Sequence, residues 1–278
     1  MKKFFSCVIT FCLGLCAFAF DATAFLAPAS GVKSYIKTDY TIASKFGEYF
    51  RTPNAKYQHI FNNFGQEVEN SELSVDGKIV DKVVYSYDSK GRIVEQTGYD
   101  DSENVIWKVV NTYDSNGLKI EESEYDGKNN LCSKSIFKYQ GTNCVDETFY
   151  NGNGALIWKN IFVYDEKNLN TESYSYYANG SLESKKVFKY NDINKIQEIT
   201  YFDSDGTTIL KRELFRYDEK NTLTEIATYS ASKVLTMRQF YKYDSRGNVA
   251  KITTYSIAKK FGTTVNELVG ISDFTYQY

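Results

Sequence analysis

The chain repeats a short Tyr-Asp sequence at a nearly constant interval, and this period constrains the fold more than any single motif does. The stretch YSYDSKGRI at residues 85–93 returns as NTYDSNGLKI at 111, FRYDEKNTL at 215 and YKYDSRGNV at 241. Taking the tyrosine of each turn as position zero, the copies fall at Tyr87, Tyr113, Tyr139, Tyr164, Tyr190, Tyr217 and Tyr243. The successive spacings are 26, 26, 25, 26, 27 and 26 residues. Self-similarity of this length is typical of a repeat architecture.

Each period predicts two strands of about eight residues and two turns, which are ordinary hairpin dimensions. Asp at the first corner of the turn and Gly at the fourth are typical of a type I turn closed by a left-handed residue. Asn168, Asn194 and Asn221 replace that Gly, and Asn is the next best residue for this backbone conformation. We therefore expect the Asp to cap its own turn rather than to perform chemistry.

The stretches YSYDSKGRI, NTYDSNGLKI and YKYDSRGNV resemble the Tyr-Asp (YD) repeats of Rhs-type proteins over roughly residues 58–278. The resemblance implies antiparallel hairpin sheets that spiral into a shell, with surface, adhesive or toxin-enclosing roles. The present chain departs from the family in its longer, two-turn period and in lacking the self-cleaving core and C-terminal toxin of the large members. The resemblance therefore implies a β architecture and an exported setting, and says little about activity.

Charged residues occupy fixed columns within the repeat. A base stands five residues before position zero, and an acid stands eight residues after it. The bases are Lys82, Lys108, Lys134, Lys159, Lys185, Arg212 and Arg238, and the acids are Glu69, Glu95, Glu121, Glu147, Glu172, Glu198 and Glu225. Lys251 breaks the acidic column in the last copy. A three-residue loop with a Gly bulge, the register we favour, places the acids on the tyrosine face. A four-residue loop places them among the bases instead.

These patterns predict an all-β fold: an antiparallel β-hairpin meander of about sixteen strands, forming a twisted or curled extended sheet. A capping segment is expected at residues 25–57, and the repeat domain at 58–278 with an insert at 256–271 that is interpreted as a short helix. The insert opens with YSIAKKFG, which echoes YTIASKFG at 40–47, so both segments are interpreted as caps on the sheet ends. Whether the sheet closes is left open by the sequence.

The first 24 residues predict a secretory signal peptide, with two lysines, an apolar run and the small-residue pattern Ala22-Thr23-Ala24. A lipid anchor at Cys16 is disfavoured because Leu15 is large for such signals. The mature chain is expected to lack a transmembrane span and to be periplasmic, outer-surface or secreted. Cys132 and Cys144 lie roughly 20 Å apart along one hairpin, beyond disulfide reach.

The sequence argues against an enzyme and against a cofactor or metal. His59 is the only histidine, no Cys or Ser has a nearby His to activate it, and no cluster has metal-ligand spacing. The net charge of -2 gives no field that would attract nucleic acid.

Binding is the more plausible function. Trp107 and Trp158 both stand six residues before a position zero, in one row on the tyrosine face. Such aromatic rows can bind a sugar ring or an apolar partner, or simply cover the sheet's own core. The candidate binding residues are Trp107, Trp158, Tyr85, Tyr87, Tyr113, Phe137 and Tyr139. We predict a non-enzymatic surface or periplasmic module for a protein or glycan partner; the alternatives are a structural or shielding protein and, less favoured, a glycan-active enzyme.

Overall fold

The computed structural model describes residues 28–260 and 262–278, and its eighteen strands belong to one antiparallel sheet. The strands are β1 (Ser34–Lys45), β2 (Glu48–Phe61), β3 (Glu67–Leu73), β4 (Ile79–Tyr87), β5 (Ile93–Asp100), β6 (Val105–Tyr113), β7 (Lys119–Asp126), β8 (Leu131–Gln140), β9 (Asn143–Asn151), β10 (Leu156–Tyr164), β11 (Asn170–Tyr177), β12 (Leu182–Tyr190), β13 (Ile196–Phe202), β14 (Ile209–Tyr217), β15 (Leu223–Ser230), β16 (Leu235–Tyr243), β17 (Val249–Lys260) and β18 (Thr263–Gln277). Within the described ranges, no helix is long and apolar enough to cross a bilayer.

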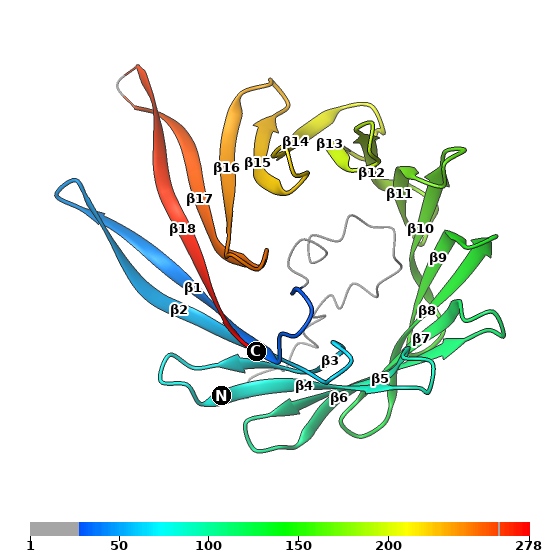
Figure 1. Cartoon of the computed structure of the whole chain (residues 1–278). Coiled ribbons are helices and arrows are strands. Elements are labelled where there is room, and N and C mark those ends of the chain that lie inside the picture. The colour runs from blue at the N-terminus through cyan, green and yellow to red at the C-terminus, as the bar shows by residue number, and fades with distance from the viewer. Residues whose placement is uncertain (1–27, 261) are drawn as a thin grey trace, which may run out of the picture.

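The sheet closes on itself into a barrel (Figure 1), because β1 pairs with β2 on one side and with β18 on the other. The seam runs antiparallel from Ser34 opposite Gln277 to Thr41 opposite Gly270. The predicted all-β hairpin meander is confirmed. The expectations of an extended sheet and of about sixteen strands are wrong: the terminal segments continue the ladder and pair with each other. Closure satisfies the backbone groups that an open edge would expose.

The two segments interpreted as caps are long hairpins. From residue 28 onward, the N-terminal segment leads into β1 and β2, which pair out to Lys45 opposite Glu48. The insert at 256–271 is not a helix: it lies within β17 and β18, which pair out to Lys260 opposite Thr263. The described residues of the two echoing octapeptides, 40–47 and 255–260 with 262, therefore lie toward the ends of these hairpins. The predicted boundary of the signal peptide lies outside the described residues.

The predicted turn is confirmed in detail at Asp88. Its backbone N–H donates to the Arg92 carbonyl (2.9 Å), and its own carbonyl accepts from the Gly91 N–H (3.0 Å). The Asp88 carboxylate accepts from the backbone N–H groups of Lys90 and Arg92 at 2.9 Å each, so the side chain caps its turn. The Gly position has a positive φ, 78° at Gly91, and Asn takes it over at 61° in Asn168 and 62° in Asn194.

The favoured hairpin register is wrong, because a bulge follows the turn. Tyr87 pairs with Ile93, as a three-residue loop requires, but Ser86 pairs with Glu95, so Val94 is an extra residue in the outgoing strand. One extra residue exchanges the faces of everything beyond it. The acid column therefore lies on the same face as the bases. The sequence analysis expected this arrangement only for a four-residue loop, whereas here the bulge causes it.

The tyrosine face is the inner face of the barrel. Phe137, Phe162, Phe188 and Phe215, each two residues before position zero, are only 3–7% exposed. The wall is a single sheet, so rings of this size are enclosed only on the concave side, where side chains converge. The largest buried cluster lies there, formed by Phe188, Ile199, Phe215, Leu223 and Ile226.

The outer face carries a girdle of ion pairs, each joining the acid of one hairpin to the base of the next. The pairs are Glu95–Lys108 (3.7 Å), Glu121–Lys134 (3.0 Å), Asp146–Lys159 (2.7 Å), Glu172–Lys185 (3.3 Å), Glu198–Arg212 (3.8 Å) and Glu225–Arg238 (2.5 Å). Small hydroxyl residues lie between them; Ser123, 4% exposed, donates to Glu121 at 2.9 Å. Burial would raise the pKa of Glu121, but hydrogen bonds from Lys134 and Ser123 hold it below its ordinary value.

Lys251, which breaks the acidic column, is accommodated at the seam. Its ammonium lies 3.6 Å from the Asp273 carboxylate on β18, and Asp273 also pairs with Arg51 at 2.7 Å. In the other hairpins the outgoing strand carries the acid and the next strand carries the base. Here the outgoing strand carries the base, Lys251, and the next strand carries the acid, Asp273, so the ion pair is kept with its charges exchanged.

Closure predicts a specific cross-link. Ile36 on β1 and Thr275 on β18 are Cα partners, although they are 239 positions apart in the chain. We expect the protein with both Ile36→Cys and Thr275→Cys to form a disulfide between these two positions on mild oxidation. Peptide mapping would identify the linked pair. Ile36→Cys with Thr224→Cys, which the register does not pair, is the control. An open sheet would give no cross-link in either protein.

The girdle predicts an acid-sensitive contribution from Glu225. Burial would raise its pKa, but Arg238 and Arg216 hold it below the ordinary value, so its stabilisation is present above about pH 4.3 and is lost as pH falls through the folded pKa. We expect Glu225→Gln to lower the free energy of unfolding by about 1–3 kcal/mol at pH 7 and hardly at all near pH 2. Glu95→Gln, in a longer and more exposed pair, should cost less than about 1 kcal/mol. Urea denaturation at both pH values measures the difference, and equal losses at both would contradict the assignment.

Candidate binding site on the lumen wall

The position-zero tyrosines hold neighbouring hairpins together. The hydroxyl of Tyr87 donates to the carbonyl of Glu67 (2.6 Å), that of Tyr113 to Ile93 (2.7 Å) and that of Tyr139 to Lys119 (2.8 Å). The same bond recurs at Tyr164, Tyr190, Tyr217 and Tyr243. Burial raises the pKa of Tyr190 and of Tyr217 to about 12, so these hydroxyls remain protonated donors.

Two other candidates from the sequence lie in the same inner wall. Phe137 is 3% exposed and lies under the Lys119 ammonium, 4.8 Å from its ring centroid. Tyr85, two residues before Tyr87, shares the inner face with it. The structure therefore places the five tyrosine and phenylalanine candidates within the packing of the wall, near the turns.

The two tryptophans also lie on the inner face, toward the opposite end of the strands. Trp107 covers Gly98 of the neighbouring strand so closely that a Cβ there would lie 2.3 Å from the indole. Trp158 stacks on Phe149 with ring centroids 4.9 Å apart and an interplanar angle of 4°. They stand on β6 and β10, four strands and about 19 Å apart, so they do not contact one another.

The hairpin β8–β9 breaks the repeat. It lacks the Asp-x-x-Gly turn: Gln140 pairs with Asn143 across a two-residue loop, and Lys138 pairs with Asp146. The outgoing strand is one residue shorter here, so Asp146 takes the outer acidic position and Glu147 turns inward, opposite Phe137. Glu147 is thus the exception to the outer acidic column. The 25-residue spacing from Tyr139 to Tyr164 is the sequence signal that marks it.

Glu147 is the acidic member of a polar row beside the Trp158 ring. Its carboxylate accepts from the Asn160 side-chain amide (3.0 Å), and the Asn160 carbonyl oxygen accepts from the Ser175 hydroxyl (2.8 Å). Burial raises the pKa of Glu147 above its ordinary value, against the opposing effect of the Asn160 hydrogen bond. Asn160 is two residues from Trp158 on the same strand, so the polar row and the stacked rings lie side by side on one face.

Phe149, Trp158 and Tyr177 form an aromatic row across β9, β10 and β11, since Trp158 pairs with Phe149 on one side and Tyr177 on the other. Tyr177 is 49% exposed. The row ends in accessible ring surface, and the polar row runs beside it. We name Phe149, Trp158, Tyr177, Glu147, Asn160 and Ser175 the lumen patch.

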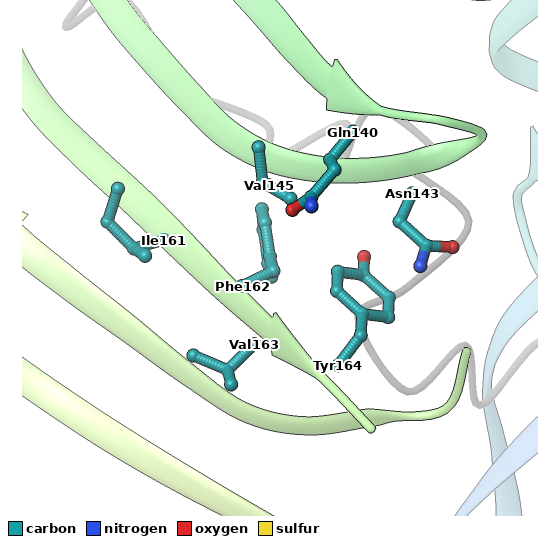
Figure 2. Close-up of a pocket in the computed structure, with 7 residues that line it drawn as sticks. All are labelled: Gln140, Asn143, Val145, Ile161, Phe162, Val163 and Tyr164. Atoms are coloured by element: carbon teal, nitrogen blue, oxygen red, sulfur yellow. The ribbon is translucent and has the colours of Figure 1, made fainter. Parts of the chain in front are cut away.

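A hollow of about 300 Å³ lies at the turn end of the same strands (Figure 2). Gln140 and Asn143 of the short loop line it together with Val145, Ile161, Phe162, Val163 and Tyr164. The hollow and the lumen patch both belong to the stretch where the repeat is interrupted.

His59, the single histidine in the sequence, is held in the packing of the wall and is not placed as a catalytic base. Its Nδ1 lies 2.5 Å from Glu67, and its ring stacks on Tyr35 at a centroid distance of 4.3 Å. Among the described residues, no group of three His, Cys, Asp or Glu side chains could hold a metal ion, and Cys132 and Cys144 form no disulfide.

Comparison with solved structures identifies a similar barrel. A porin-like protein from Bacteroides uniformis ATCC 8492 matches over 90% of this chain and 99% of its own, with a TM-score of 0.50 and 11% identity. A porin-like protein from Bacteroides vulgatus ATCC 8482 gives a TM-score of 0.35 at 9% identity, covering 88% of this chain and 98% of its own. The Tc holotoxin pore of Photorhabdus luminescens gives 0.29 at 10% identity, covering 83% of this chain and 16% of its own. The first match shows a shared fold, and the two lower scores carry no argument. No protein-family description and no curated protein matches the sequence.

We name the interhairpin hydrogen bonds of the position-zero tyrosines the tyrosine ladder. Removing one of them is expected to change the stability of the protein and not its binding. Tyr113→Phe removes one hydroxyl whose acceptor, the Ile93 carbonyl, stays in place. We expect a loss of about 0.5–1.5 kcal/mol in the free energy of unfolding, measured by urea denaturation. Tyr177→Phe, at a half-exposed ring, is the matched control and should change stability by less than half as much. Equal effects would argue that the ladder bond contributes nothing.

Proposed function

We propose that this chain is an exported, non-enzymatic barrel of the cell envelope that binds a glycan at the lumen patch. The observation that carries the proposal is the change in the repeat at the β8–β9 hairpin. At this hairpin, Glu147 is moved from the outer acidic column to the lumen, beside the stacked Trp158 and Phe149 rings. A purely structural wall does not require this one member of the acidic column to turn from the outer face to the lumen.

The lumen patch has the chemistry of a sugar site. Aromatic faces pack against the C–H faces of pyranose rings, while carboxylate, amide and hydroxyl groups beside them bind the sugar hydroxyls. Glu147, Asn160 and Ser175 supply one of each, and the hydrogen bonds among them hold the groups in place. A row of three aromatic rings suits an extended chain better than a single monosaccharide.

The ion pairs on the outer wall favour water over lipid as the surroundings of the barrel. Six ion pairs lie across its outer face between β5 and β16, whereas a membrane barrel presents an apolar band to lipid. A basic residue on a lipid-facing wall costs about 2–4 kcal/mol at the bilayer midplane. The fold shared with a porin-like protein supports an envelope setting, and the charged wall supports a place outside the hydrocarbon.

Glycan hydrolysis is the second candidate, because Glu147 is the kind of acid that such a reaction uses. Burial raises its pKa, and the nearby charge of Glu122 raises it further, while Lys119 pairs with Glu122 at 2.7 Å. Glycosidases employ a pair of carboxyl groups, one as the acid and one as the nucleophile or base. Product analysis of any bound glycan, with Glu147→Gln as comparison, separates hydrolysis from binding alone.

Binding is tested by removing the two tryptophans. We expect the wild-type protein to bind members of an array of immobilised bacterial glycans, and the Trp107→Ala, Trp158→Ala protein to lose affinity at least tenfold for the same glycans. The single Trp158→Ala change should account for most of the loss, because only that ring adjoins the polar row. Titration calorimetry with the glycan that the array selects measures the difference.

The matched control is Ile106→Ala with Ile157→Ala. These residues precede the two tryptophans and lie on the outer face, 45% and 41% exposed. The control protein should bind as the wild type does, and circular dichroism should show both variants folded. Unchanged binding by the double tryptophan variant would refute the lumen patch as the site. No glycan binding by the wild-type protein would favour a shielding wall without a ligand.

A further inference from the structure

Two neighbouring hairpins extend beyond the rest of the barrel. β1, β2, β17 and β18 have 12, 14, 12 and 15 residues, against 7–10 for the other strands. The pairing between the two hairpins ends at Thr41 opposite Gly270, and beyond it each hairpin continues alone. Figure 1 shows the hairpins β1–β2 (blue) and β17–β18 (orange to red) extending beyond the rest of the barrel and diverging. We name residues 42–51 the first finger, and residues 255–260 with 262–269 the second.

The first finger presents aromatic rings to solvent. Phe46 at its tip is fully exposed, at 104%, and Tyr49 and Phe50 are 49% and 50% exposed. Phe46 also has a positive φ of 55°, a conformation that suits Gly or Asn and is disfavoured for a bulky side chain. An exposed phenylalanine at this position does not stabilise the hairpin, because Asn would adopt the positive φ at a lower conformational cost.

The sequence of the tip is used twice. YTIASKFG at 40–47 and YSIAKKFG at 255–262 agree at six of eight positions, including Lys-Phe-Gly at the end. Their Lys45 and Lys260 both lie at the last pair of their hairpins. The repeat units share no such sequence at their turns, so the duplication belongs to the fingers and not to the wall.

The fingers are basic in an acidic chain. They hold Lys45, Arg51, Lys259 and Lys260 against Glu48 and Glu267, whereas the whole chain has a net charge of -2. Two of these bases are in ion pairs, Lys260 with Glu267 and Arg51 with Asp273. Exposed aromatic rings flanked by basic side chains are the composition that enters the headgroup region of anionic bilayers.

We propose that the two fingers anchor the barrel to an anionic lipid surface. The rings insert among the headgroups and the lysines pair with lipid phosphates. The barrel wall stays in water, because its girdle of ion pairs does not enter hydrocarbon. The contact is peripheral and reversible, and it is independent of glycan binding in the lumen.

Sedimentation with lipid vesicles tests the anchor. The wild-type protein should sediment with vesicles of 30% phosphatidylglycerol in phosphatidylcholine, and weakly with phosphatidylcholine alone. Phe46→Asp should reduce partitioning roughly tenfold, and Lys45→Glu about fivefold or more, since each basic residue near such a surface contributes about a fivefold factor. Phe46→Trp should retain binding and show quenching by brominated lipids.

Phe64→Asp is the matched control, because Phe64 is also a turn residue, 88% exposed, at the other end of β2. It should sediment as the wild type does. The proposal is overturned if the wild type binds neither vesicle, if Phe46→Asp sediments unchanged, or if Phe64→Asp loses as much as Phe46→Asp. Equal binding to neutral and anionic vesicles would also overturn it, since the lysines would then play no part.

Discussion

The barrel depends on one extra residue after each Tyr-Asp turn. Because side chains alternate along a strand, the bulge between Ile93 and Glu95 leaves the first residue facing the tyrosines and sends the second to the opposite face. Repeated through the hairpins, this step gives an aromatic inner wall and an ionic outer girdle. Without it, Glu172, Glu198 and Glu225 would lie on the face of the buried phenylalanines, and the bases would lack their acidic partners.

Closure depends on departures from the repeat at its two ends. The last repeat carries Lys251 in place of an acid, and the acid reappears as Asp273 on the closing strand. Tyr276 donates to the Val249 carbonyl at 2.8 Å, so the tyrosine ladder continues into β18 although the turn motif does not. The seam is therefore built from the same contacts as the wall, with the order of the charges exchanged.

The sequence alone was sufficient to predict the features that depend on residues close together in the chain. The period, the Asp-capped turn and the left-handed Asn168 follow from residue types at adjacent positions. The register did not follow, because Asp-x-x-Gly specifies the loop but does not indicate the bulge three residues after its Gly. Closure did not follow either, since pairing between β1 and β18 is a contact between the ends of the chain. The helix expected at 256–271 was wrong because two long strands there complete the ladder.

The fold alone leaves the function undecided, because similar barrels can present opposite surfaces. A barrel that spans lipid has an apolar wall and a polar lumen; this one has a charged wall and an aromatic inner face. What distinguishes this chain lies where its copies disagree. The inward Glu147 marks the lumen, and the exposed Phe46 marks the fingers. The first feature provides hydrogen-bonding groups beside stacked rings, and the second provides bare apolar surface beside positive charge. These chemistries suit different ligands and lie on different parts of the barrel, so the two proposed contacts do not compete for the same surface.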